Sequence, residues 1–192
     1  MEIYEDIETY TPFNEQEAVD KRTILAVLES DEACFDRSAQ AHMTCSVWTV
    51  DAAMEQTLFV YHDIYDSWSW IGGHADGEHD LASVALRELE EETGVAGARL
   101  VPCCGSDILS LETLTVDGHE KLGVYVSSHL HLNVTYLAVA DPAEPLRCAP
   151  GENSAVAWMP MDEALKRSTE PWMRDRIYRK IVAKLAAARS DA

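Results

Sequence analysis

The sequence lacks any long hydrophobic run, although hydrophobic residues make up 47% of its 192 positions. A helix that crosses a bilayer needs about 20 consecutive apolar residues, so we expect no membrane insertion. The beginning of the chain, MEIYEDIETYTPF, also lacks the basic leader and apolar segment of a signal peptide. These absences predict a cytoplasmic protein, and the length fits one domain.

Basic residues are scarce as well. Fifteen Lys and Arg stand against 34 Asp and Glu, and the formal net charge at pH 7 is -19. A surface of this sign repels DNA and RNA, so we expect no long nucleic acid as a partner. Carboxylates that gather in one place instead bind hard cations, which in turn bind phosphate. Most of the acidic side chains are nevertheless expected to form a solvated surface.

The five cysteines form no C-x-x-C pair and show no zinc-like spacing. We expect them to be reduced and buried. Cys103 and Cys104 are adjacent in the sequence, which disfavours a disulfide between them because its geometry would be strained.

Hydrophobic periodicity and capping residues predict an alternation of helices and strands. Helices are predicted at residues 14–28, 80–93, 161–166 and 171–188. Strands are predicted at residues 42–50, 57–62, 99–104, 108–116, 129–136 and 155–159, with the first two in a hairpin, and residues 118–123 are predicted as a turn or mobile loop. We expect residues 1–40 to be a helical extension packed on a domain of residues 41–192.

The last predicted helix has two distinct sets of residues. Its buried stripe is predicted to contain Met173, Ile177, Ile181 and Leu185, which recur every four residues. Its basic residues are expected to form a solvated face and are Arg174, Arg176, Arg179 and Lys180.

A glycine-containing loop followed by a Glu-rich helix carries the strongest chemical signal. From Gly72 the chain reads GGHADGEHDLASVALRELEEETGV. On a helix Glu88, Glu91 and Glu92 stand at i, i+3 and i+4 and share a face. Each like-charged pair costs a few tenths of a kcal/mol or so, so this face favours either full solvation or a cation. The positions expected to pack on a sheet are Ala82, Ala85, Leu86 and Leu89.

The residues around this helix closely resemble the Nudix box, a family signature of the form G-x5-E-x7-R-E-U-x-E-E-x-G-U, in which U is aliphatic. The match begins at Gly73 and ends at Val95. Every specified position agrees except His79, where the family usually has Glu. Glu78 lies one position earlier and would substitute only if the loop rearranged. The resemblance implies an α/β fold, namely an α/β/α sandwich with a mixed β-sheet.

The resemblance also implies a chemistry. Mg²⁺ or Mn²⁺ is the implied cofactor, and its implied ligands are the Gly73 carbonyl, Glu88, Glu91 and Glu92. The implied reaction is attack of a metal-activated water on one phosphorus of a diphosphate. Arg87 would orient a glutamate through a salt bridge, while Glu88 or Glu91, or Glu152 outside the helix, would remove the proton of the water.

Other residues are candidates for substrate contact. His129, His131, Asn133 and Thr135 lie on one side of the strand predicted at residues 129–136. The two histidines also resemble part of a metal site, but no third ligand has an evident spacing, so hydrogen-bonded histidines are the simpler interpretation. Trp68 and Trp70 are suited to stack on a base or to join the core. The candidates for substrate binding are therefore Trp70, His129, His131, Asn133 and Glu152.

The leading hypothesis is a hydrolase that cleaves the diphosphate linkage of a small, nucleotide-linked substrate. One alternative is an isopentenyl-diphosphate isomerase, which shares the fold but requires a reactive cysteine near the start of the box, and residues 67–73 contain none. The other is a non-catalytic nucleotide- or sugar-binding module, against which the intact glutamates argue. A homodimer is expected because it is the commonest symmetric assembly.

Overall fold

The computed structural model describes residues 2–121 and 123–190. Its helices are α1 (Glu2–Thr9), α2 (Glu15–Ser30), α3 (Leu81–Thr93), α4 (Met161–Arg167) and α5 (Arg179–Ser190), with two shorter helical segments, η1 (Glu32–Phe35) and η2 (Met173–Tyr178). Its strands are β1 (Ala41–Val50), β2 (Gln56–His62), β3 (Ser67–Ser69), β4 (Ile71–His74), β5 (Arg99–Leu100), β6 (Ile108–Val116), β7 (His119–Lys121), β8 (Val124–Val126), β9 (His129–Val139) and β10 (Asn153–Pro160).

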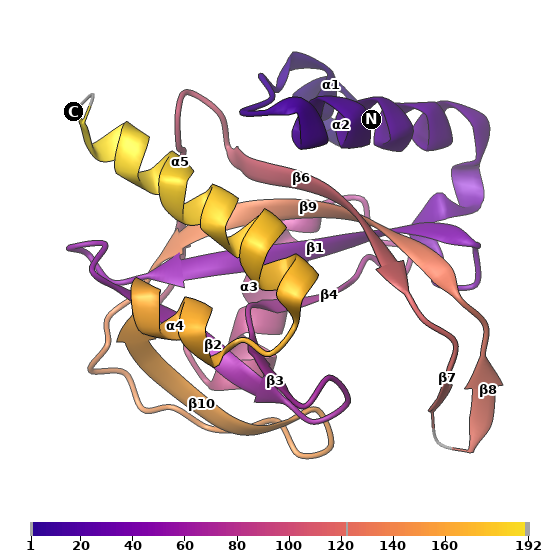
Figure 1. Cartoon of the computed structure of the whole chain (residues 1–192). Helices are drawn as coiled ribbons and strands as arrows, with labels where there is room; N and C mark the ends of the chain where they lie inside the picture. Colours follow the sequence, from indigo (N-terminus) through magenta and orange to yellow (C-terminus); the bar gives the residue numbers. More distant parts are fainter. Residues whose placement is uncertain (1, 122, 191–192) are drawn as a thin grey trace.

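Strand β1 lies inside the large sheet and pairs with three other strands. It runs parallel to β9, from Ala41 opposite Leu130 to Val50 opposite Val139, and antiparallel to β2 and β4. Strand β10 extends the sheet beyond β2, while β5 and β6 both pair with β9. Helix α3 lies behind this sheet, and α4 and α5 lie in front of it (Figure 1). The predicted α/β/α sandwich with a mixed sheet is therefore confirmed.

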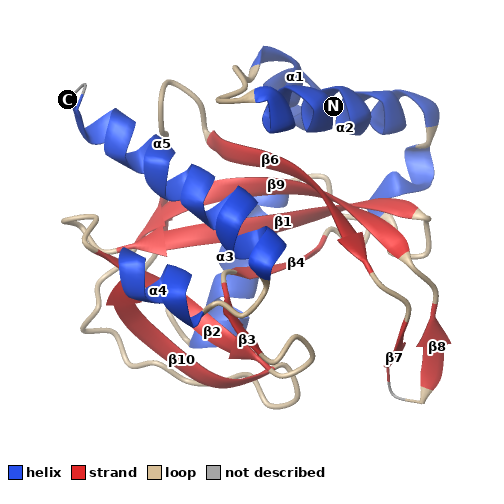
Figure 2. Cartoon of the chain, viewed as in Figure 1, coloured by secondary structure: helices blue, strands red, loops and turns tan. Residues whose placement is uncertain are grey.

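Alternation along β1 explains why both faces of the sheet are covered, since successive side chains point to opposite faces. Cys45 and Val47 belong to an apolar core that also contains Leu89 of α3. Trp48 belongs to a second core that contains Ile181 of α5. Figure 2 shows the resulting order of layers, with helices on either side of the strands. The predicted stripe of the last helix is buried at Ile177, Ile181 and Leu185, and Met173 is half-buried.

Most predicted elements are confirmed, and the differences have local causes. The strand predicted at residues 99–104 is limited to Arg99 and Leu100. Pro102 has no N–H to donate to a strand ladder, and Cys104 adopts a φ of 53° in the following turn. Residues 118–123 contain β7 and the connection to β8, but Leu122 lies outside the described residues. The sequence pattern does not predict α1, which is held by burial of its apolar side chains, Ile3 and Ile7.

Two burial predictions are wrong in part. The buried face of α3 is rotated toward the glutamates and contains Leu81, Val84, Ala85, Leu89, Glu92 and Thr93, whereas Ala82 and Leu86 are half-buried. All five cysteines are free, as expected, but Cys104 and Cys148 are exposed. Cys104 is exposed because it stands in the left-handed turn, and Cys148 because it lies in the Pro-containing connection before β10.

A buried ionic network joins the N-terminal helices to the end of the chain. Lys180 Nζ of α5 lies 2.9 Å from Glu112 Oε1 of β6 and 3.3 Å from Glu17 Oε1 of α2. The prediction of a solvated basic face is thus wrong for Lys180, which is only 6% exposed. Its charge is tolerated there because two carboxylates surround it. Helices α1 and α2 are held in this way at the β6 edge of the sheet (Figure 1).

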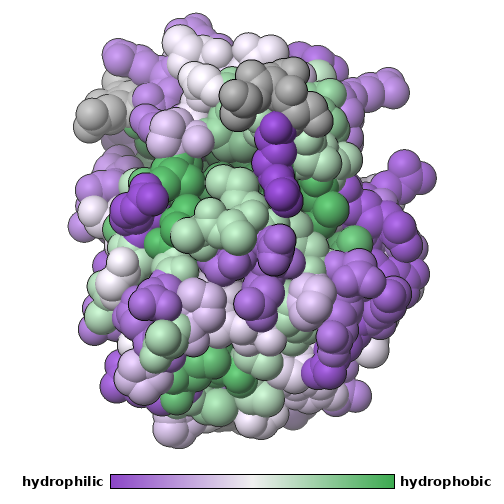
Figure 3. All heavy atoms as spheres, turned by 90° about the vertical axis from the view of Figure 1, so that its left-hand side faces the viewer, coloured by the Kyte–Doolittle hydropathy of each residue, from purple (hydrophilic) through white to green (hydrophobic). Residues whose placement is uncertain are grey.

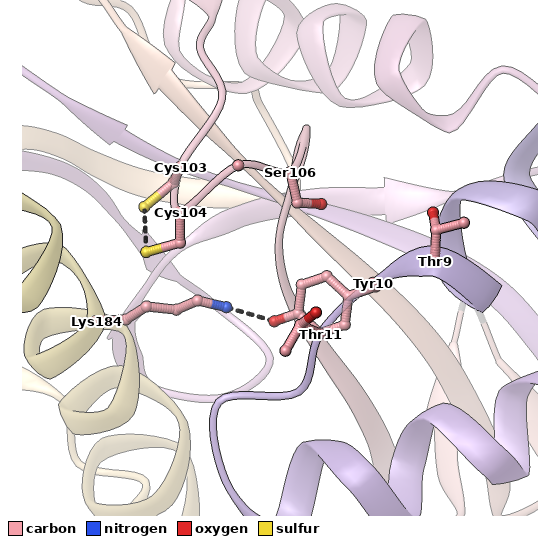
Figure 4. Close-up of a pocket in the computed structure, with 8 residues that line it drawn as sticks. Thr9, Tyr10, Thr11, Cys103, Cys104, Ser106 and Lys184 are labelled. Carbon is pink, nitrogen blue, oxygen red and sulfur yellow. Dashed lines mark hydrogen bonds between the residues drawn. The ribbon is translucent and has the colours of Figure 1, made fainter.

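Lys184 makes a second connection between the two ends of the chain. Its ammonium donates to Tyr10 Oη and to the Leu109 carbonyl. Lys184 and Tyr10 border a cavity of about 60 Å³, which Cys103 and Cys104 also line (Figure 4). A cavity of this size is far smaller than the roughly 300 Å³ that ligand pockets start from, so we interpret it as a packing void.

Along the parts of the chain that the structure describes, no helix is long and apolar enough to span a bilayer. The face beside the C-terminal end of α5 is mixed, with hydrophobic residues in small groups that polar side chains interrupt (Figure 3).

Candidate functional site

Helix α3 is positioned by a cap at each end. Asp80 Oδ1 accepts a hydrogen bond from Ser83 N at 3.1 Å, which satisfies one of the N–H groups left free in a first helical turn. Gly94 adopts a φ of 82° and donates its N–H to the Glu90 carbonyl, an arrangement that ends helices because glycine tolerates the left-handed conformation. These local signals fix where the glutamates of the helix lie.

Strand β4 brings two glycines against the glutamates. A Cβ atom at Gly73 would lie 2.5 Å from Glu88 Oε2, so any larger residue would have to displace this carboxylate. The Gly72 N–H donates to Glu92 Oε1 at 3.2 Å. Two carboxylates of α3 therefore contact the backbone of one glycine pair.

The two carboxylates carry charge that the protein compensates poorly. Burial raises the pKa of Glu92 to about 8, the hydrogen bond from Gly72 opposes this rise, and the negative charges of Glu152 and Glu88 add to it. Burial likewise raises the pKa of Glu88, and the neighbouring Glu91 carboxylate raises it further. A cation bound between them would relieve this repulsion.

The remaining predicted catalytic residues lie around this pair. Arg87 Nη2 is 3.6 Å from Glu88 Oε1. Glu91 is exposed on α3, and Glu152 is exposed in the loop that precedes β10. The charges of Glu91 and Glu152 both raise the pKa of Glu88. These two carboxylates therefore lie close enough to Glu88 to interact with it electrostatically.

Trp70 packs in the core rather than standing free. Its ring meets Tyr178 edge-on, with the ring centroids 5.4 Å apart, and the backbone N–H of Trp70 donates to Tyr178 Oη at 3.4 Å. Trp70 is half-buried. Of the two roles considered from the sequence, stacking on a base or joining the core, these contacts agree with the second. Trp68 also packs against the second core.

His79, the one departure from the box, supports the loop through an aromatic contact. Its ring stacks on Phe35 of η1, with the centroids 3.9 Å apart. Next to it, Glu78 Oε1 accepts hydrogen bonds from the backbone N–H groups of His79 and Asp80. Glu78 is therefore occupied as a local cap and does not replace the missing carboxylate. The Gly77 N–H also donates to the Phe35 carbonyl at 2.8 Å, so η1 braces this loop.

A cluster of histidines lies on the sheet face opposite α3. Strand register places His42 of β1 opposite His131 of β9. In the pairing of β4 with β1, His74 lies opposite Thr44, two residues from His42. Ligating nitrogens of these three residues lie within 4.8 Å of one another. Burial lowers the pKa of His131 to about 3, and the neighbouring His74, His42, His129 and His119 lower it as well.

Sequence reasoning identified His131 and missed His42 and His74. No local signal marks either residue, because the two histidines reach His131 through pairing of distant strands. The relevant signal is the register of β1 against β9, which a sequence pattern does not specify.

Asn133 and Thr135 belong to a buried polar network on the same face. Asn133 Nδ2 donates to Glu112 Oε2 at 3.0 Å, and Thr135 Oγ1 donates to the same oxygen at 2.8 Å. Asn133 Oδ1 accepts from Thr44 and Ser46. The side chain of Asn133 thus has all its hydrogen bonds inside the protein, and it is 1% exposed.

The fold resembles those of several solved hydrolases. A structure of a C. elegans Ap4A hydrolase binary complex is 20% identical, has a TM-score of 0.54, and aligns with 76% of this chain and 98% of that one. The E. coli dihydroneopterin triphosphate pyrophosphohydrolase is 13% identical, with a TM-score of 0.52 and coverage of 73% and 95%. A NUDIX hydrolase from Nitrosomonas europaea is 16% identical, with a TM-score of 0.54 and coverage of 76% and 88%. These likenesses concern the fold.

No curated protein matches the sequence. The family model of the NUDIX domain, however, matches residues 42–181. This range contains the glycine pair of β4, the whole of α3, the loop with Glu152, and the clustered histidines of β1, β4 and β9. Since the match extends over well more than half of the sequence, the chain belongs to the Nudix family.

Proposed function

We propose that the protein is a metal-dependent hydrolase that cleaves the diphosphate linkage of a small, nucleotide-linked substrate. The observation that carries this proposal is the contact of Glu88 and Glu92 with the backbone of Gly73 and Gly72. These contacts hold two carboxylates close together. The chain belongs to a family whose members act on diphosphate linkages.

The residues at this place fit a divalent cation. The pKa values of Glu88 and Glu92 are raised because burial and mutual repulsion disfavour their charged forms, and a cation would reverse that effect. Oxygen ligands in this number suit Mg²⁺ or Mn²⁺. The residues that would hold the ion are Gly73, through its carbonyl, and Glu88, Glu91 and Glu92.

Side chains of the protein have the other roles in the reaction. When bound, the cation supplies an activated water and neutralises charge on the diphosphate oxygens. Arg87 orients the Glu88 carboxylate through their ion pair. Glu88 or Glu91 accepts the proton of the attacking water, and Glu152 is the candidate for that role outside the helix. Glu152, which is exposed, stays a proposed substrate contact. The other candidates, Trp70, His129, His131 and Asn133, lie on the sheet face opposite α3, where Trp70 packs on Tyr178 and Asn133 is engaged in the buried network.

The isomerase alternative requires a reactive cysteine near the start of the box. The structure places a cysteine there, but it is not reactive. Cys45 pairs with Gly73 across β1 and β4, so a thiol does lie beside the start of the box. It is 1% exposed, and burial, together with the charge of Glu88, raises its pKa to about 12. A thiol in this state is a packing group, since reactivity requires the thiolate.

The test is product release from a panel of nucleoside triphosphates, nucleotide sugars, ADP-ribose, dinucleoside polyphosphates and isopentenyl diphosphate, each with Mg²⁺ or Mn²⁺. The panel includes dinucleoside polyphosphates because the C. elegans structure is named for Ap4A. Wild type is compared with Glu91→Gln and Glu92→Gln. The matched control is Glu90→Gln, which makes the same charge change at an exposed position of α3.

We expect metal-dependent cleavage that falls at least about 100-fold in Glu91→Gln and Glu92→Gln and stays near wild type in Glu90→Gln. Tight binding of a panel member without turnover would instead support the binding module. Isomerisation of isopentenyl diphosphate would support the isomerase. The cytoplasmic location, the homodimer and the division of the chain at residue 40 stay predictions.

A further inference from the structure

The histidine cluster has the features of a metal site that the diphosphate chemistry does not use. Its three members come from three strands, β1, β4 and β9, and their side chains converge on one face of the sheet. Nitrogens from separate strands lie within 4.8 Å of one another, near the roughly 3.3 Å that separates two ligands on a tetrahedral zinc ion with bonds of about 2.0–2.1 Å.

His42 is prepared as a ligand by its own hydrogen bond. Its Nδ1 lies 2.8 Å from the Ala39 carbonyl, which accepts but cannot donate, so Nδ1 carries the hydrogen of a neutral ring. The lone pair is then on Nε2. His42 is 2% exposed, and its Nε2 has no hydrogen-bond partner among the described residues. A buried nitrogen with an unused lone pair is costly unless something binds it.

His129 adds a fourth imidazole beside the cluster. Its Nδ1 lies 2.8 Å from the Ser127 carbonyl, so its lone pair is also on Nε2, which lies 3.2 Å from His131 Nε2. His129 Nε2 is then the acceptor of this hydrogen bond and His131 Nε2 the donor. The lone pair of His131 is therefore on Nδ1, and His129 orients the His131 ring from outside the cluster.

We propose that His42, His74 and His131 bind one borderline transition-metal ion, of which Zn²⁺ is the best fit, at a site separate from that of Glu88, Glu91 and Glu92. Imidazole nitrogens select zinc, copper, nickel and iron, whereas carboxylate oxygens suit magnesium and manganese. The carbonyl that holds the Nδ1 hydrogen of His42 is the outer partner that metal-binding histidines usually have.

The site would join three strands and give His131 a role other than direct substrate contact. His74 directly follows the glycine pair that contacts Glu88 and Glu92. An ion on His74 would therefore fix the end of β4 against β1 and β9.

The test uses the full chain, freed of metal by a chelator and titrated with Co²⁺ in excess Mg²⁺. We expect one equivalent of Co²⁺ to give the intense visible absorption of a tetrahedral nitrogen site, and one equivalent of Zn²⁺ to displace it. A weak octahedral spectrum in the wild-type protein would overturn the proposal without any variant.

Variants then locate the ion. Direct Zn²⁺ titration calorimetry is expected to show at least a 10-fold weaker affinity in His42→Gln, His74→Gln and His131→Gln, and an unchanged affinity in His62→Gln. Circular dichroism checks that each variant is folded. Zn²⁺ binding that persists in all three cluster variants, or that disappears in Glu88→Gln/Glu92→Gln while the cluster is intact, would contradict the assignment. Loss of Zn²⁺ binding in the Glu88→Gln/Glu92→Gln variant would mean that the ion binds at the glutamate site. The hydrolase proposal is tested separately, by the panel assay, and does not depend on this result.

Discussion

Lys180 Nζ lies 2.9 Å from Glu112 Oε1, and the two side chains are 3% and 0% exposed. Through this contact and that with Glu17, one ammonium holds the terminal helix, strand β6 and helix α2 together. Buried ion pairs of this kind are strongly damaged by loss of one partner, because the other charge stays buried without compensation.

Lys180→Met is therefore expected to destabilise the protein by about 3–5 kcal/mol, measured as the shift of the urea unfolding midpoint at pH 7. The matched control is Lys166→Met, which removes a pair of similar length, 2.7 Å, whose side chains are 75% and 71% exposed. Exposed pairs contribute little, so the control should unfold near the wild-type midpoint. Equal midpoints for both variants would contradict our interpretation of the network.

The same network predicts sensitivity to acid. Burial alone raises the pKa of Glu17, but Lys180, the Phe13 N–H and Lys184 outweigh it, and the net pKa lies below the ordinary value of 4.5. Because the folded pKa is below the unfolded one, Glu17 contributes stability that is complete above about pH 4.5 and is lost as pH falls through the folded pKa.

Urea unfolding from pH 7 to pH 3 checks this direction. Wild type should lose more stability than Glu17→Gln over this range, so that the two curves converge at low pH. Parallel curves would mean that the Glu17 carboxylate is not stabilised in the folded state.

The adjacent glycines of β4 should respond differently to alanine. At Gly73 the new Cβ meets the flexible end of the Glu88 side chain, whereas at Gly72 it meets the Cys45 carbonyl of the neighbouring strand. Gly73→Ala is expected to change unfolding stability by less than about 1 kcal/mol but to lower activity at least about 10-fold, because it moves a carboxylate. Gly72→Ala is expected to cost about 1–3 kcal/mol through overpacking.

Thermal melting and the panel assay on both glycine variants separate these effects. Retention of full activity by a folded Gly73→Ala protein would argue against a catalytic role for the observed position of Glu88.

The cap of α3 provides a local test of the same helix. Asp80→Ala removes the acceptor for Ser83 N and should cost about 1 kcal/mol, seen as a lower melting temperature. Asp80→Asn keeps an acceptor oxygen and should melt close to wild type. If the two variants melted alike, the cap would not contribute to stability.

The sequence predicts the parts of the molecule that depend on near neighbours. The start of α3 follows from Asp80 and its end from Gly94, while β9 follows from the alternation of polar and apolar residues over residues 129–136. The three glutamates of the box are adjacent or nearly so, so their spacing on a helix places them together without knowledge of the sheet.

The missed features depend on distant pairing. Lys180 looks like a surface residue because its acidic partner Glu112 is 68 positions away. His42 and His74 look isolated until β1 pairs with β9 and β4. Register between strands this far apart is set by the complete hydrophobic core, which a pattern along one segment does not contain.

The parallel pairing of β1 with β9 also has a consequence for how the chain folds. Thr44 and Asn133, which face each other in this pair, are 89 positions apart. Such long-range contacts slow folding, because the entropy of closing a long loop is lost before the contacts form. During synthesis, β1 can meet β2 and β4 soon after it is made, but its parallel edge must wait for β9. The strand at the centre of this sheet is therefore among the first to be translated, yet its pairing is completed only when β9 has been made.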